Sequence, residues 1–76
     1  MLIVSQSKKT VVNLETMESV VAGDDNTIRA FPCCYVEEEE MLYYSVGAYE
    51  SETKAKSVLV QLWSDYANGK KVFIMP

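Results

Sequence analysis

The first fifty residues alternate between short β-rich runs and polar turns. Apolar and β-branched residues gather in residues 2–5, 10–14, 20–22, 27–36 and 41–49, and polar or turn-forming residues separate these runs. Runs of this length favour strands, and the short turns between them favour antiparallel pairing. We therefore predict an antiparallel β-meander of about five strands.

The pattern then changes to a helical period. Apolar residues recur at i, i+3, i+4, i+7, i+8 and i+11 and form one stripe: Ala55, Val58, Leu59, Leu62, Trp63 and Tyr66. Ser51 is a good N-cap, and Gly69 suits the left-handed position after a helix. We predict an amphipathic α-helix over about residues 51–68, packed on one face of the sheet. We expect Trp63 to lie in the core and Asp65 to lie off the stripe.

A last short strand is predicted over residues 72–75, after the helix. The elements together predict a single α+β domain over residues 1–76, because no linker, repeat or change of composition divides the chain. With 76 residues, such a domain buries a small core, and self-association is a common way to add stability.

One helix covers only one face of a sheet, so the other face needs a separate account. Strand alternation assigns it aromatic and methionine side chains, which are enriched in protein interfaces. Monomers rarely expose large apolar patches, so we predict a contact surface here. The alternative is that the sheet curls and buries these side chains within one chain. The candidate interface residues are Phe31, Tyr35, Met41, Tyr43 and Tyr49.

The charge of the chain argues against several kinds of partner. The formal net charge is −4, and the chain contains a single arginine, Arg29. A nucleic-acid or anionic membrane surface would need a dense basic face, so we expect neither partner. No apolar run reaches the roughly 20 residues of a membrane-spanning helix, and residues 1–4 are too short for a signal peptide. We therefore expect a cytoplasmic protein with reduced thiols.

The residues that could carry chemistry are few. The chain has no histidine, the commonest general base and metal ligand in proteins. Cys33 and Cys34 are adjacent, and we interpret them as small apolar strand residues. The acidic run 37–40 fits no calcium loop, so we interpret it as a solvated loop, with attraction of a basic partner as the alternative. We predict no enzyme activity, no metal and no cofactor.

Several segments resemble one group of proteins. The matching segments are residues 1–6, 12–14, 46–52, 55–59 and 72–76, and they include the pattern G-x-Y-x-S-E-x-x-A-x-x-V-L and the ending Met-Pro. The chain resembles small proteins of Firmicutes bacteria and their phages that have no assigned activity. The resemblance implies a phage or prophage accessory factor, a class that often blocks a host protein or sequesters a signalling nucleotide.

Two functional hypotheses follow. The first is a non-enzymatic, self-associating protein that binds a host protein, as a counter-defence or regulatory factor. The alternative is an oligomeric sponge for a signalling nucleotide, with an aromatic ring stacked on the base. Such a sponge would need cations brought together across subunits, and the candidates are Arg29, Lys8, Lys9, Lys70 and Lys71.

Overall fold

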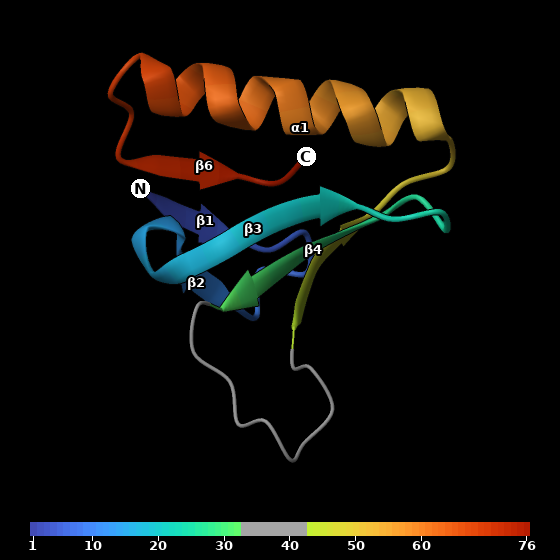
Figure 1. Cartoon of the computed structure of the whole chain (residues 1–76), viewed down its shortest axis with the longest axis horizontal. Coiled ribbons are helices and arrows are strands. Elements are labelled where there is room, and N and C mark those ends of the chain that lie inside the picture. Colours follow the sequence, from blue (N-terminus) through green and yellow to red (C-terminus); the bar gives the residue numbers. More distant parts are fainter. Residues whose placement is uncertain (33–42) are drawn as a thin grey trace.

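The computed structural model describes residues 1–32 and 43–76. In these ranges the chain forms six strands, one 3-10 turn and one α-helix, as shown in Figure 1. In chain order they are β1 (Leu2–Val4), β2 (Val11–Asn13), η1 (Leu14–Thr16), β3 (Met17–Ala22), β4 (Thr27–Pro32), β5 (Tyr44–Ala48), α1 (Glu52–Ala67) and β6 (Val72–Ile74). The predicted α+β class, the helix and the short last strand are confirmed.

The strands form two three-stranded sheets. Sheet A has the order β2-β1-β6, and sheet B has the order β3-β4-β5. All pairs are antiparallel except β1 with β6, which run parallel with Leu2 opposite Val72. A meander cannot make such a pair, because parallel neighbours need a long crossover, and here the chain returns through α1. The last strand therefore completes the sheet that the first two began.

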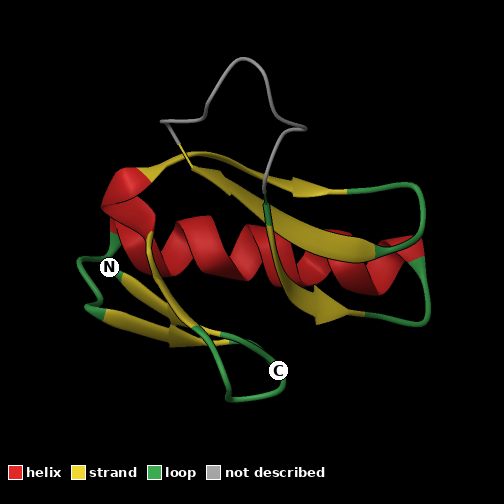
Figure 2. Ribbon diagram, turned by 90° about the horizontal axis from the view of Figure 1, so that it is seen from below, coloured by secondary structure: helices red, strands yellow, loops and turns green. Residues whose placement is uncertain are grey.

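Helix α1 lies along one face of sheet B and packs on β3 and β4 (Figure 2). Side chains from the helix and from both sheets meet in one core, which consists of Ile3, Val12, Ile28, Ala30, Val46, Val58, Leu62, Phe73 and Met75. Burial of this apolar surface is the main stabilising contribution available to so small a domain. No helix in residues 1–32 and 43–76 is long and apolar enough to cross a membrane.

Both ends of α1 follow the predicted capping chemistry. The side chain of Ser51 accepts a hydrogen bond from the backbone N–H of Lys54 at 3.1 Å, which satisfies one of the free donors of the first turn. Gly69 has a φ of +79°, a left-handed conformation that costs glycine little. The Ser51 cap therefore sets the start of the helix, and the left-handed Gly69 sets its end.

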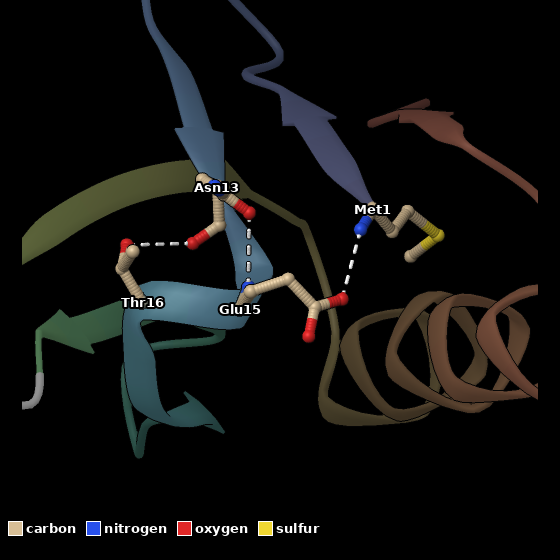
Figure 3. Close-up of polar contacts among 4 residues, drawn as sticks. All are labelled: Met1, Asn13, Glu15 and Thr16. Carbon is tan, nitrogen blue, oxygen red and sulfur yellow. Dashed lines mark hydrogen bonds and ion pairs between the residues drawn. The ribbon is translucent and has the colours of Figure 1, made fainter.

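The turn η1 carries the chain from sheet A to sheet B. Asn13 holds it in place, because its side-chain oxygen accepts from the N–H of Glu15 and its carbonyl accepts from the hydroxyl of Thr16 (Figure 3). The amino group of Met1 lies 3.1 Å from a carboxylate oxygen of Glu15. These contacts fix the point at which β3 enters sheet B beside the helix.

Strand β5 departs from the simple alternation expected for it. A bulge opposite Ile28 and Arg29 places Val46 and Gly47 in succession in buried positions. Tyr49 then packs against the core, and its hydroxyl donates to the carbonyl of Pro76 at 3.2 Å. A Cβ on Gly47 would lie 2.7 Å from the Tyr49 hydroxyl, so the glycine leaves room for the ring. The prediction that Tyr49 faces away from the core is therefore wrong.

Candidate functional site

The apolar stripe of α1 consists of two rows with different surroundings. The buried row is Ala55, Val58, Leu62 and Asp65. The open row is Leu59, Trp63 and Tyr66, and it lies about 90° further around the helix at ~100° per residue. The buried row faces the core together with the half-buried Leu59, because a helix lying on a sheet covers a limited arc of its own surface.

The open row forms one wall of an apolar groove. Trp63 is 61% exposed and Tyr66 is 48% exposed, whereas Leu59 is half-buried. The opposite wall comes from η1 and the first residues of β3, and the groove measures about 310 Å³. We call it the α1–β3 groove; its lining residues are Leu14, Met17, Glu18, Ser19, Val20, Leu59, Leu62, Trp63 and Tyr66.

Two expectations for the helix are wrong. Trp63 was expected in the core but lies mostly in solvent on the open row. Asp65 was expected off the stripe but is only 8% exposed and belongs to the buried row. Its carboxylate accepts a hydrogen bond from Gln61 at 2.7 Å and lies 3.7 Å from the ammonium of Lys70. These polar partners allow a carboxylate to replace an apolar residue beside the core.

A second aromatic surface lies on the outer face of sheet B, away from the helix. The rings of Phe31 and Tyr43 have centroids 5.6 Å apart, and the guanidinium of Arg29 lies 5.2 Å from the centre of the Tyr43 ring. Asp25 binds both terminal nitrogens of Arg29, and this hydrogen bonding lowers the pKa of Asp25. Two of the predicted interface residues, Phe31 and Tyr43, therefore lie together on this face, with Arg29 over the ring of Tyr43.

No family model, curated protein or solved structure matches this chain. The functional assignment therefore depends on the geometry of the molecule itself.

Several candidate residues from the sequence fall in the part of the chain that the structure does not describe. Tyr35, Met41, Cys33, Cys34 and the acidic run 37–40 lie outside the described residues. In the parts of the chain that the structure describes, no three His, Cys, Asp or Glu residues are grouped so that they could hold a metal ion.

The cations of the sponge hypothesis come from three separate places. Because β1 and β6 run parallel, Lys70 and Lys71 lie where these strands start, whereas Lys8 and Lys9 lie in the turn beyond the end of β1. Arg29 lies in β4 and is paired with Asp25. One subunit therefore presents these cations at different places, and a nucleotide pocket would depend on assembly.

The α1–β3 groove is the feature that the sequence prediction missed. The signal was the width of the apolar stripe, since only three of its six apolar residues, Ala55, Val58 and Leu62, belong to the buried row. The residue that marked the excess was Trp63, whose large ring can lie against a neighbouring surface without being enclosed.

Proposed function

We propose that this protein is a non-enzymatic binding protein that contacts another polypeptide through the α1–β3 groove. The observation that carries the proposal is the exposure of Trp63 and Tyr66 beside an apolar cavity wall. Large aromatic side chains dominate the energy of protein interfaces, and these two rings lie together on the wall of one apolar groove.

The likeness to phage and prophage proteins supports a host protein as the target, encountered in the host cytoplasm. In this proposal the protein acts by occupying its target, as a counter-defence or regulatory factor. The groove supplies the apolar contact, and the net charge of −4 favours targets with basic residues near the contact.

The experiment compares three forms of the tagged protein in pull-downs from a lysate of the organism that encodes it. The wild type, Trp63→Lys and the matched control Val60→Lys are compared, and recovered proteins are quantified by mass spectrometry. Val60 lies on the same helix and is 49% exposed, but it does not line the groove. We expect a protein that is recovered in near-equal amount by the wild type and by Val60→Lys and is lost with Trp63→Lys. Recovery of the same proteins in equal amount by Trp63→Lys and by the wild type would contradict the proposal.

A nucleotide sponge is the second candidate, and the position of Arg29 over the ring of Tyr43 favours it, since a base stacks on such surfaces. Against it, the Asp25 carboxylate already occupies the guanidinium. A ligand that binds only the folded state raises the melting temperature, so cyclic dinucleotides at millimolar concentration should raise it if the sponge exists. An unchanged melting temperature would eliminate this candidate.

A further inference from the structure

We propose that the partner in the α1–β3 groove is a second copy of this chain, joined by antiparallel pairing of the two β3 strands. This inference rests on the proposed function, because it uses the same groove, and a host protein would compete with the second copy for that groove. It would make one six-stranded sheet from two copies of sheet B, with both α1 helices on the same face and their open rows turned toward each other.

A comparison of the sheet edges identifies β3 as the one available for pairing. Of the four edge strands among the described residues, β2 and β6 have three residues each. The outer edge of β5 is already occupied by Gln6. The backbone N–H of Gln6 donates to the carbonyl of Val46, and the side-chain oxygen of Gln6 accepts from the N–H of Ala48. Strand β3 has six residues, and no described residue pairs with its outer edge.

The backbone of β3 presents hydrogen-bonding groups to that edge. The N–H of Gly23 donates to Thr27 at 2.9 Å, which marks a hydrogen-bonded position of the β3–β4 hairpin. Hydrogen-bonded positions alternate along an antiparallel pair, so the backbone N–H and C=O groups of Val21 and Ser19 also point toward β4. Val20 and Ala22 fall between them, and their N–H and C=O groups therefore point outward.

Strand β3 has few of the devices that usually protect an exposed edge, namely one charged residue, Glu18, and one bulge. It contains no lysine or proline, and its bulge lies at the start, between Met17 and Ser19. The remaining residues up to Ala22 are regular and fit pairing with another strand. Such strand addition gives affinity through main-chain hydrogen bonds, and the groove beside it supplies apolar contact.

Charge distinguishes between two registers of the pair. Glu18 is the single charged residue of β3, and Asp24 follows two positions after the strand. With the two-fold axis at Val20, Glu18 faces Ala22 of the other copy. With the axis at Val21, Glu18 would face the like-charged Asp24, which is destabilising. The axis at Val20 therefore keeps the carboxylates apart and lets Val20 bond to its own equivalent.

The two exposed rings supply part of the area that a stable dimer needs. At total ring areas of about 150–250 Å² each, the exposed parts of Trp63 and Tyr66 provide roughly 200 Å² per copy. A standard interface buries about 800 Å² per partner. The outer edge of β3 and the neighbouring helix surface would supply the remainder, with the two rings as the central anchors.

The first experiment measures mass and fluorescence against concentration. Sedimentation should show the 8.6 kDa chain converting to a species of twice that mass as concentration rises. Trp63 is the only tryptophan, so its emission should shift to the blue along the same curve. Trp63→Lys should raise the dimer Kd by roughly 30-fold or more, the effect of losing an aromatic anchor, whereas Val60→Lys should not change it.

A cross-linking experiment tests the register without requiring a disruptive variant. In the proposed pair, Ser19 of one copy lies opposite Val21 of the other, at a non-hydrogen-bonded position with Cα atoms about 4.5 Å apart, a spacing that a disulfide accepts. Ser19→Cys and Val21→Cys are prepared separately in a background with Cys33→Ser and Cys34→Ser. Oxidation of their mixture should give a covalent dimer, and oxidation of either variant alone should give at least about tenfold less.

Three results would overturn the inference. They are a wild-type chain that stays monomeric at millimolar concentration, a dimer that Trp63→Lys does not weaken, and cross-linking of either cysteine variant alone as efficiently as the mixture. The proposed function fails separately. A monomer that still captures another protein through Trp63 would end only the dimer, whereas a dimer that captures no other protein would end only the host-protein target.

Discussion

The two rows of α1 differ in both composition and exposure. The buried row packs on sheet B, and its Leu62 belongs to the core, whereas the open row presents Trp63 and Tyr66 to solvent. The difference follows from the rotation of the helix on the sheet, since one face of a helix can contact only the strands beneath it. An apolar residue in the buried row therefore contributes to the stability of the fold, whereas Trp63 and Tyr66 contribute less to it.

The largest expected effect separates the rows directly. Leu62→Ala should lower the free energy of unfolding by about 2–5 kcal/mol, because it removes buried methyl groups and leaves a cavity. Trp63→Ala, measured at a concentration where the chain is monomeric, should change it by only about 0.5 kcal/mol, as for other exposed sites. Urea unfolding followed by circular dichroism measures both. Equal losses would show that the two rows do not differ.

A change in the sheet beneath the buried row should be intermediate in size. Gly47→Ala would place a methyl group against the hydroxyl end of Tyr49, and such overpacking costs about 1–3 kcal/mol. The measurement is the same urea titration, with Ala48→Gly as a control for glycine content. A Gly47→Ala protein as stable as the wild type would show that the Tyr49 ring moves aside without cost.

The N-cap tests whether both rows depend on the same helix. Ser51→Ala should lower the free energy of unfolding by about 1 kcal/mol, because Lys54 loses the acceptor for its N–H. Ser57→Ala, at an exposed position within the helix, should be neutral or slightly stabilising, since alanine has the higher helix propensity. Thermal melts of the two variants give the comparison, and equal melting temperatures would contradict a capping role.

The smallest effect concerns the outer face of sheet B, which α1 does not touch. Arg29 lowers the pKa of Asp25 from its ordinary value of 3.8. The ion pair therefore stabilises the fold above that value, and its contribution is lost as the pH falls through the lowered pKa. The melting temperature of the wild type should exceed that of Asp25→Asn at about pH 6, and the difference should shrink as the pH falls below the ordinary pKa of 3.8. A difference independent of pH would exclude the ion pair as its cause.

Local chemistry allowed the helix to be predicted well, and long-range pairing limited the rest. Ser51, Gly69 and the apolar period gave helix bounds close to those observed, because caps and periodicity act over a few residues. The parallel pair of β1 with β6 depends on contacts between distant parts of the chain, which strand patterns do not record. The bulge that turns Tyr49 toward the core depends equally on a partner strand.

The candidate site was the least predictable part. The sequence showed that α1 has a wide apolar stripe, but the arc that faces the sheet depends on how the helix is rotated in the folded molecule. Asp65 made the buried face of the helix harder to predict from the sequence. A carboxylate can lie in the buried row only because Gln61 donates a hydrogen bond to it and the ammonium of Lys70 lies close to it. The prediction therefore placed Trp63 in the core and missed the groove beside β3.

The parallel pair also has a consequence for synthesis of the chain on the ribosome. Strand β1 is the middle strand of sheet A, and its Ile3 is fully buried. Its partner residues in β6 lie 70 positions later in the chain. The same separation divides Gln6 from Pro76, whose carbonyl accepts a hydrogen bond from the Gln6 side chain. During translation β1 can pair with β2 as soon as both strands have left the exit tunnel. The other edge of β1 stays unpaired until β6 has also emerged from the tunnel. A stalled nascent chain would then present β1 as an uncovered apolar strand, the kind of segment that chaperones recognise.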